Sequence, residues 1–527
     1  MLAWADSCSR SNHHERHLSS GTVALRLQAL ASLFFAALCL GPPGMAEPIP
    51  TPKLKSQRLA AFRAFAEQAR QKLQVPGVAV GIIQGDQILL AEGFGQRRLG
   101  ASEAPDADTL FMVGSTTKPL TSLLLARMVD QGKLSWSTPL QALLPELRLA
   151  DPVLQQRLQV RHLLCACSGL PRRDLPLFLG FETSTPATLL ASLATWQPSR
   201  PLGQAFSYSN QLPAVAGFLA GRVAFPKLEL GVAYDRAMQE QLFTPLGMTA
   251  TTLSFDDALK RPNLAWPHGF DGQARLVPVD SAMNRSVVPA RPSGGVWSTV
   301  NDMLRYVALE LRAGQLPNGT PYLSPQALHA RARPQVRVAP EGFYGLALEI
   351  DHAFGSPVLL HTGSTAGYAS LLFWLPQQRI GAVVLTNGDQ GLVLARLLQQ
   401  RLLELVLPIQ PEAEALLREQ AAGLQAQRQL ALAGLVLPAD PRASQRLASR
   451  YYSPDLGWLH VRREHGNTRF DFGGFVSTVG TRSQKDGSLA FVIVDAGLNG
   501  VTFVPADATA RTLVVREQAQ VYRYRAQ

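Results

Sequence analysis

The sequence predicts an α+β fold, in which an antiparallel sheet flanked by helices is followed by a small all-β barrel. Three observations support this prediction: an amphipathic helix near the start, apolar strand pairs on both sides of a long mixed middle, and a series of short strands at the end. Helices at both ends of an antiparallel sheet are typical of a layered α+β architecture, because each element must bury its apolar face against another.

The first helix is predicted over residues 56–73, with Ser56 as its cap. Apolar residues there recur at the three-and-four spacing of a helix that buries one face: Leu59, Phe62, Phe65, Ala69 and Leu73. Two strands follow, over residues 78–83 and 87–91, and the intervening Gly85 and Asp86 predict a hairpin.

The middle of the chain predicts a further helix over residues 114–132 and another that starts after Thr299. Thr299 and Asp302 have the spacing of a capping box. Beyond them, residues 368–375 and 380–386 are apolar runs separated by a Pro-Gln-Gln-Arg turn, which predicts a second hairpin of the sheet.

After about residue 408 the composition changes. Residues 412–437 are rich in Ala, Leu, Gln and Glu and predict a connecting helix. Eight short strand candidates follow Leu447 at regular spacing, as in a small barrel or sandwich: 450–452, 458–461, 469–472, 476–481, 489–494, 500–504, 512–516 and 520–524. The expected segments are therefore a main domain over 47–410, a helical linker over 411–439 and a barrel over 440–527.

The chain carries a formal charge of +11, from 50 Lys and Arg against 39 Asp and Glu among 527 residues. Only eight of the 50 are lysines, and the arginines are spread through every predicted element. A nucleic-acid surface needs clustered cations, so we expect no nucleic-acid partner. The positive field can instead favour association with an anionic envelope surface.

An apolar run over residues 27–40 follows Arg10, Arg16 and Arg26. It is shorter than the about 20 residues that span a bilayer. The small residues Gly44 and Ala46 fit a signal-peptidase site, so residues 1–46 are predicted to be a signal peptide of an exported, periplasmic or secreted protein. An uncleaved membrane anchor is the alternative, which N-terminal sequencing of the native protein would distinguish.

Removal of the leader takes Cys8 and Cys39 with it and leaves Cys165 and Cys167. A disulfide across one intervening residue would be strained, and two thiols without nearby partners fall short of a tetrahedral metal set. We therefore expect no disulfide framework, no metal and no cofactor.

Ser115-Thr-Thr-Lys118 is the first motif that can carry chemistry. Residues three apart share a helical face, so the Lys118 amine can lie against the Ser115 hydroxyl. A serine hydroxyl becomes a good nucleophile when a desolvated lysine takes its proton. A solvated lysine in the first turn of a helix is the alternative for this motif alone.

Two weaker motifs follow. In Tyr208-Ser-Asn210, a nearby lysine would lower the proton affinity of Tyr208 and make it a general base, while Asn210 can donate to a substrate carbonyl. In His361-Thr362-Gly363, Gly363 lets a substrate backbone lie along a strand edge, and His361 and Thr362 can donate to a substrate. A capping Asn beside a half-buried Tyr, and a polar turn entering a strand, are the respective alternatives.

Together and in this order, the three motifs resemble those of the serine β-lactamase and penicillin-binding-protein superfamily, in its class C-like branch. The resemblance extends from about Val75 to Asp389 and includes several further segments: 75–80, 111–118, 161–170, 245–249, 294–303 and 385–387. The last domain resembles the lipocalin-like barrels that follow some catalytic domains of this branch.

The resemblance implies a role for each matching residue. Ser115 would be the acylated nucleophile, Lys118 its activator and Tyr208 the general base. The backbone amides of Ser115 and Ser364 would form the oxyanion hole, which stabilises charge in the tetrahedral state. Asn210 and the strand residues 361–364 would bind the substrate.

Two departures from the family pattern bear on the substrate. His361 stands where the family has a lysine, and a histidine is largely neutral above pH ~6.5, so it anchors a carboxylate less firmly. Residues 165–169 read Cys-Ala-Cys-Ser-Gly, where the family has Thr-His-Thr-Ser-Gly.

The function expected from these motifs is an exported serine hydrolase that cleaves an amide or ester of a small molecule or short peptide, such as a D-amino-acid peptide or a cell-wall fragment. A β-lactamase or D-Ala-D-Ala carboxypeptidase is the enzymatic alternative. A penicillin-binding sensor that stays acylated is the other alternative.

Overall fold

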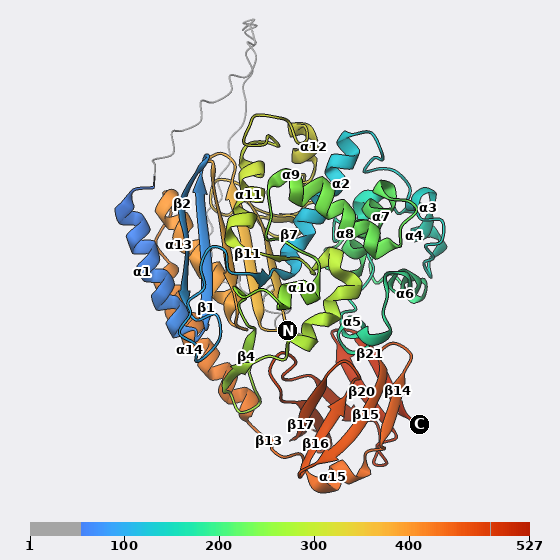
Figure 1. Cartoon of the computed structure of the whole chain (residues 1–527). Helices are drawn as coiled ribbons and strands as arrows, with labels where there is room; N and C mark the ends of the chain where they lie inside the picture. Colours follow the sequence, from blue (N-terminus) through green and yellow to red (C-terminus); the bar gives the residue numbers. More distant parts are fainter. Residues whose placement is uncertain (1–53, 485) are drawn as a thin grey trace, which may run out of the picture.

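The computed structural model describes residues 54–484 and 486–527 (Figure 1). Helix α1 (Ser56–Lys72) forms as predicted and packs on an eight-stranded sheet. The predicted leader, residues 1–46, lies outside the described residues. The sheet is antiparallel throughout, in the order β2-β1-β12-β11-β10-β9-β8-β7. Its strands are β1 (Gly77–Gln84), β2 (Gln87–Gly95), β7 (Val336–Ala339), β8 (Gly342–Tyr344), β9 (Glu349–Asp351), β10 (Val358–Thr365), β11 (Tyr368–Leu375) and β12 (Ile380–Thr386).

Both faces of this sheet are covered by helices, which explains why its central strands are continuous apolar runs. Side chains of β11 alternate between the two faces: Leu371 and Phe373 pack with α1 and with α13 (Gly391–Val406), whereas Leu372 and Trp374 pack on the opposite side. Helix α11 (Val300–Leu311) covers that opposite side (Figure 1). Thr299 caps α11 through the Asp302 amide, as predicted.

A helical region lies beyond α11, on the opposite side of the sheet from α1 and α13 (Figure 1). Its central helix, α2 (Thr117–Asp130), is buried along most of its length between α7, α12 and their neighbours. The other helices of this region are α3 (Leu140–Leu143), α4 (Pro152–Arg157), α5 (Leu175–Leu179), α6 (Pro186–Ser192), α7 (Gln211–Ala224), α8 (Leu230–Met238), α9 (Thr244–Leu246), α10 (Phe255–Leu259) and α12 (Pro325–Ala330).

Helix α14 (Ala413–Leu432) leads from the sheet to a closed eight-stranded antiparallel barrel (Figure 1). Pairing of β17 with β18 closes the barrel, and β13 (Leu435–Val436) adds to β17. The predicted connecting helix is five residues too long, because Gly434 adopts a φ of +66° and β13 begins. The remaining elements are α15 (Pro441–Arg446), β14 (Arg450–Ser453), β15 (Gly457–Glu464), β16 (Asn467–Asp471), β17 (Val476–Ser483), β18 (Leu489–Ile493), β19 (Thr502–Pro505), β20 (Thr512–Glu517) and β21 (Gln520–Ala526).

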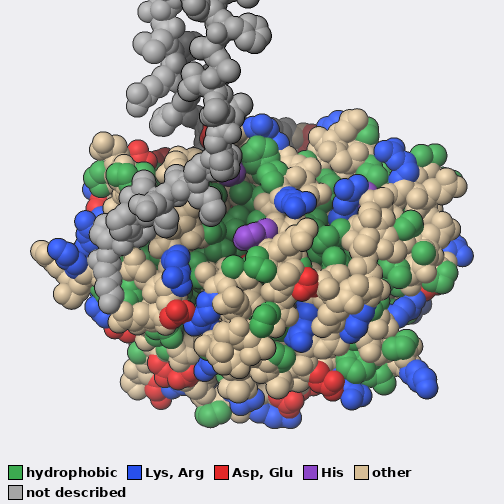
Figure 2. All heavy atoms as spheres, turned by 90° about the horizontal axis from the view of Figure 1, so that it is seen from above, with side chains coloured by type: hydrophobic (Ala, Val, Ile, Leu, Met, Phe, Trp, Pro, Cys, Tyr) green, Lys and Arg blue, Asp and Glu red, His purple; other side chains and the backbone are tan. Residues whose placement is uncertain are grey.

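The predicted fold class is confirmed by this architecture, including all eight predicted barrel strands. Among the described residues, no helix combines the length and apolar character needed to cross a bilayer. On the face shown in Figure 2, acidic and basic side chains are interspersed rather than gathered by sign.

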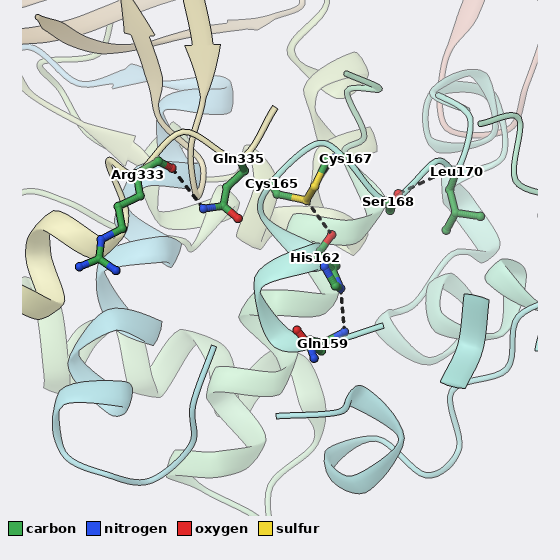
Figure 3. Close-up of a disulfide and its surroundings, with 8 residues drawn as sticks. All are labelled: Gln159, His162, Cys165, Cys167, Ser168, Leu170, Arg333 and Gln335. Carbon is green, nitrogen blue, oxygen red and sulfur yellow. Dashed lines mark hydrogen bonds between the residues drawn. A yellow bond between two sulfur atoms is a disulfide. The ribbon is translucent and has the colours of Figure 1, made fainter. Parts of the chain in front are cut away.

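Cys165 and Cys167 form a disulfide (Figure 3), so the expectation that they stay unbridged is wrong. Ala166 between them adopts a left-handed φ of +49°, and the two Cα atoms lie 5.1 Å apart, within the usual range for a disulfide. The Ala166 carbonyl accepts a hydrogen bond of 2.7 Å from the Ser207 amide, and both cysteines are buried. The bridged loop therefore supports the backbone next to Tyr208.

Alkylation should report this bridge directly. Iodoacetamide added to the denatured, unreduced protein should leave Cys165 and Cys167 unmodified, because both sulfurs are in the bond. Reduction before alkylation should add two carbamidomethyl groups to the peptide that contains them. Mass spectrometry of that peptide is the measurement, and alkylation without reductant would contradict the bridge.

Candidate active site

Ser115 lies in the 3-10 turn Gly114–Thr116, directly before α2. Gly114 has a φ of +55°, and a Cβ there would lie 2.7 Å from the Ser364 amide nitrogen. A Cβ on Gly363 would lie 2.1 Å from the Val113 carbonyl oxygen and 2.9 Å from the Ser115 amide nitrogen. The turn and β10 can approach this closely only because both residues are glycine.

This close approach has two consequences for the predicted roles. It brings the amides of Ser115 and Ser364 to the same contact between turn and strand, where they are available for the oxyanion hole that the family resemblance implies. It also changes the interpretation of Gly363. The glycine accommodates the Ser115 turn, whereas the sequence predicted that it accommodates a substrate backbone.

The Lys118 amine connects three segments of the chain. Its Nζ donates to Ser115 Oγ at 2.9 Å, to Asn210 Oδ1 at 2.7 Å and to the Ser293 carbonyl oxygen at 2.8 Å. An ammonium has three donors, so these acceptors satisfy it completely. The alternative of a solvated lysine is wrong, because Lys118 is fully buried.

Burial also sets the acidity of Lys118. Loss of hydration disfavours the charged form and lowers the pKa of the Lys118 amine well below its ordinary value, although the charge of Asp174 acts in the opposite direction. Arg172 lowers it further. The side chain can therefore lose its proton at a lower pH than a surface lysine and can then accept the proton of Ser115.

Tyr208 behaves in the opposite way to the expectation. Its ring lies beside Lys118, with Nζ 4.8 Å from the ring centroid, and it shares a hydrogen bond with Ser115. Burial nevertheless raises the pKa of the Tyr208 hydroxyl, and this outweighs the lowering by Ser115 and Arg172. The prediction that a neighbouring cation lowers its proton affinity is therefore wrong in its net direction, and the resting form is the protonated phenol.

Asn210 stands directly before α7 but does not cap that helix. Its Oδ1 accepts from Lys118, and its Nδ2 donates to Asp174 Oδ1 at 2.9 Å. The amide is thus held between a cation and an anion, and one of its two N–H donors remains for a substrate carbonyl.

Asp174 belongs to the site although no motif indicated it. Its buried carboxylate accepts from Asn210 and, at 2.6 Å, from Arg172 Nε. Arg172 in turn lies over the Tyr208 ring at 5.2 Å. The sequence offered one signal, a run of charges at 172–174 directly after the Ser-Gly-Leu-Pro segment, but no spacing linked it to Asn210.

His361 does not have the geometry of a substrate-binding group. It is buried, with Nδ1 2.6 Å from the Thr362 carbonyl oxygen and Nε2 3.0 Å from Tyr344 Oη. A carbonyl can only accept, so Nδ1 carries the proton and Nε2 accepts from Tyr344. Burial and the Lys118 charge lower the pKa of His361 to about 3. The predicted donation from His361 to a substrate is therefore corrected, and the lowered pKa agrees with the neutral imidazole expected from the sequence.

A small pocket opens beside Ser115. Asn210 and Ser364 contribute polar groups to it, and Ser364 is exposed on β10. Apolar side chains complete the wall from α5 and from the 3-10 segment Ser281–Ser293: Leu177, Phe178, Val287 and Ala290. Thr362 is half-buried on β10 and lies outside this lining. Sequence reasoning missed the apolar wall, since α5 carries no motif.

In the part of the chain that the structure describes, no group of three or more His, Cys, Asp or Glu side chains is arranged to hold a metal ion. The positioned groups around Ser115 are thus an amine, a phenol, an amide and two backbone N–H groups. Such a set can activate a hydroxyl, stabilise an oxyanion and protonate a leaving group.

Comparison with known proteins places these residues in a family. The model of the β-lactamase family matches residues 62–407. Penicillin-binding protein 4 of Amycolatopsis lactamdurans is 29% identical over 330 residues, which cover 60% of this chain and 82% of that protein. A β-lactamase of Lysobacter lactamgenus is 26% identical over 390 residues, covering 69% and 93%.

Solved structures show the same fold. The octameric penicillin-binding protein homologue from Pyrococcus abyssi aligns with a TM-score of 0.57 at 20% identity and covers 88% of this chain and 99% of its own. A β-lactamase/D-alanine carboxypeptidase from Pseudomonas syringae aligns with a TM-score of 0.54 at 20% identity, covering 66% and 99%. The residues outside the barrel make up less than 88% of this chain, so the first alignment must include residues of the barrel.

The buried His361 predicts a pH dependence of stability. The folded-state pKa is about 3, against an ordinary value of 6.5. Between these two pH values the histidine binds a proton in the unfolded chain but not in the folded chain. The free energy of unfolding should therefore fall as pH falls below about 6.5. Between pH 6.5 and 5, the free energy of unfolding of His361→Asn should fall by about 2 kcal/mol less than that of wild type.

Urea denaturation at a series of pH values measures this effect. His162, whose pKa burial lowers to about 4, titrates in the same window and remains in the variant, so part of the slope should persist. His329→Asn, at an exposed position of α12, is the matched control and should leave the slope unchanged. An equal slope in wild type and His361→Asn would contradict the prediction.

Proposed function

The chain belongs to the β-lactamase family of serine hydrolases, and on that basis we propose that it forms an acyl-enzyme on Ser115 and releases the acyl group to water. One observation carries the proposal most directly: the buried Lys118 amine lies 2.9 Å from Ser115 Oγ and has no other acceptors than Asn210 and Ser293 among the described residues. A serine, a buried base and two amide donors at one contact are the parts that acyl transfer requires.

The opposite pKa shifts of Lys118 and Tyr208 support a different role for each. The neutral amine of Lys118 takes the Ser115 proton as Oγ attacks the substrate carbonyl, and the amides of Ser115 and Ser364 stabilise the oxyanion. The Tyr208 hydroxyl, still protonated, gives its proton to the leaving amine or alcohol. Lys118 then returns the transferred proton to the tyrosine through the hydrogen bonds around Oγ. Attack by water on the ester repeats these steps and restores Ser115.

The pocket favours a substrate with a small acyl group. Its apolar wall accepts a small acyl group, and the only cation beside Tyr208 besides Lys118, in the described part of the chain, is Arg172. Because His361 is neutral and buried, no ammonium stands at the third motif. This supports an amide or ester of a short peptide, such as a D-amino-acid peptide or a cell-wall fragment, as the substrate.

Export of the mature protein to the periplasm or medium belongs to the same proposal.

A β-lactamase or D-Ala-D-Ala carboxypeptidase is the second candidate, because relatives carry the names β-lactamase and penicillin-binding protein. A penicillin-binding sensor is the third. The persistence of the acyl-enzyme distinguishes them: turnover of a β-lactam indicates a β-lactamase, whereas a lasting adduct indicates a penicillin-binding protein.

Intact-mass spectrometry tests the nucleophile and substrate together. Wild type is expected to form an adduct with a fluorophosphonate probe and a transient acyl-enzyme with members of a panel of D-peptides, esters and β-lactams. Ser115→Ala should form neither, because the attacking oxygen is absent.

Ser364→Ala is the matched control, because it also removes a pocket hydroxyl but leaves the nucleophile and the strand amide in place. It should still be labelled. Labelling of Ser115→Ala at the wild-type rate would refute the assignment.

A further inference from the structure

Glu517, the last residue of β20, joins the barrel to the candidate active site. Its side chain is only 3% exposed. Oε1 accepts from the Asp174 amide at 2.8 Å, and Oε2 accepts from the Leu175 amide at 3.0 Å. Within the barrel, Tyr522 donates to Oε2 at 3.2 Å. Two of the three bonds to this buried carboxylate therefore come from the hydrolase domain.

Hydrogen bonds continue from there to Lys118. The Asp174 carboxylate accepts from Asn210 Nδ2, and Asn210 Oδ1 accepts from Lys118 Nζ. By accepting from Nδ2, the carboxylate favours the orientation of the Asn210 amide in which Oδ1 faces Lys118. The position of that carboxylate depends on the backbone of Asp174, which Glu517 holds.

We propose that Glu517 is a positioning residue for the hydrolase site: by fixing the Asp174 and Leu175 amides from the barrel, it orients Asn210 toward Lys118. This inference rests on the proposed function, because it assumes that Lys118 activates Ser115. It makes the barrel part of the catalytic unit, although no barrel residue lines the pocket beside Ser115.

Glu517 is buried where its carboxylate needs hydrogen-bond partners. Removing a carboxylate from water is costly unless it is paired or hydrogen-bonded, and the barrel core around it is apolar and aromatic. The charged and titratable groups that face it are Asp174, Arg172, Arg173 and Tyr522. Burial and the Asp174 charge raise the pKa of Glu517 to about 7.

The test compares acylation rates with a fluorophosphonate in wild type and Glu517→Gln. The amide keeps the shape but places an NH₂ group against a backbone N–H. Acylation of Glu517→Gln is expected to be at least about tenfold slower at pH ~8.5, because small displacements of catalytic groups are costly. Near pH ~5.5 the two rates should converge, because wild-type Glu517 is then protonated. The titration of Lys118 affects both proteins, so its effect cancels when the acylation rate of wild type is divided by that of Glu517→Gln at the same pH.

Tyr524→Phe is the matched control. Tyr524 is also buried in the barrel and donates to the Leu456 carbonyl, but among the described residues it forms no hydrogen bond with residues 172–175. It should lower the Tm about as much as Glu517→Gln while its acylation rate stays at the wild-type value. A rate ratio near one at every pH, with wild type labelled, overturns the proposal.

A wild type that resists labelling would refute the proposed function instead. A crystal structure of Glu517→Gln then still decides the positioning role. An Asn210 oxygen displaced from Lys118 supports it, and an unmoved Asn210 overturns it.

A second inference rests on the outer face of the barrel. Tyr452 on β14 and Trp458 on β15 are cross-strand partners, with ring centroids 5.0 Å apart, and are 39% and 44% exposed. His460 stacks on Trp458 at 5.9 Å. Large aromatic rings exposed together on one strand pair form an apolar platform, although the planes of the Tyr452 and Trp458 rings are tilted by 53° to each other.

Arginines surround this platform. Arg450 lies over Trp458 at 5.7 Å, and Arg525 is the cross-strand neighbour of Tyr452. Arg523 is exposed on the same face of β21. Within residues 54–484 and 486–527, none of these three arginines forms an ion pair, in contrast to Arg462 on the same barrel.

The platform lies near the site. The turn between β14 and β15 contacts Gly180, which ends α5, and Asp455 in that turn pairs with Arg173 at 3.1 Å. Figure 1 shows α5 above the barrel beside β21. A polymer held on the platform can therefore extend toward the pocket wall.

We infer that the barrel patch, formed by Arg450, Tyr452, Trp458, His460, Arg523 and Arg525, binds a polysaccharide that carries carboxylates. The apolar face of a sugar ring packs on Trp458 and Tyr452, and guanidinium groups bind carboxylates through paired hydrogen bonds. A bilayer is a poorer match. Val521 is the only exposed residue among the aliphatic neighbours on these strands, whereas membrane binding needs a large apolar face.

Binding assays on the full-length mature protein test this inference with polygalacturonate, neutral dextran, polyglutamate and phosphatidylglycerol vesicles as probes. Polygalacturonate is expected to bind, and Trp458→Ala to weaken that binding about tenfold, as for an aromatic hot spot. Trp266→Ala is the matched control, because Trp266 is an exposed tryptophan under Arg98 outside the barrel. It should bind like wild type.

The inference is overturned by no binding of polygalacturonate, by binding of polyglutamate with equal affinity, or by binding of vesicles in preference to the polysaccharide. An unchanged affinity of Trp458→Ala also overturns it.

Discussion

The hydrolase site depends on the buried amine of Lys118. A buried ammonium is tolerated only where acceptors replace water, and leaving one of its donors without an acceptor costs about 1–3 kcal/mol. Here the acceptors come from the turn before α2, from the residue before α7 and from the carbonyl that ends the segment Ser281–Ser293. Satisfying one side chain therefore brings together three parts of the chain, and Ser115 and Asn210 are placed in the process.

Burial also divides the chemistry among the residues around Ser115. It lowers the pKa of Lys118, raises that of Tyr208 and keeps His361 neutral, although the three side chains lie next to one another. In each case the charged form is disfavoured, so the amine is present as the free base at a lower pH and the phenol keeps its proton. The neighbouring charges of Asp174 and Arg172 only modify this outcome. The pair of opposite shifts is what an acyl-transfer site needs, because one group must take a proton while another gives one.

Hydrolase domain and barrel share one short helix. Leu175 and Leu179 of α5 pack in the barrel core, while Leu177 and Phe178 line the pocket beside Ser115. Just before α5, Glu517 holds the backbone of Asp174. The pocket wall and the backbone that carries Asp174 are therefore in direct contact with the barrel. The Pyrococcus abyssi structure aligns over both parts, which indicates that the combination recurs in another protein of this fold.

The sequence by itself determined the elements and the motif residues. Periodicity predicts α1, both hairpins of the sheet and the barrel strands, because burial of one face imposes a repeat on neighbouring residues. The spacing of Ser115 and Lys118 likewise places them together within one turn of helix. Only the tertiary structure decided the rest. Asp174 and Glu517 come from segments 343 residues apart, and no spacing in the sequence links them. The directions of the pKa shifts, the enclosure of His361 and the Cys165–Cys167 bridge depend on burial and on backbone geometry, which sequence spacing does not specify.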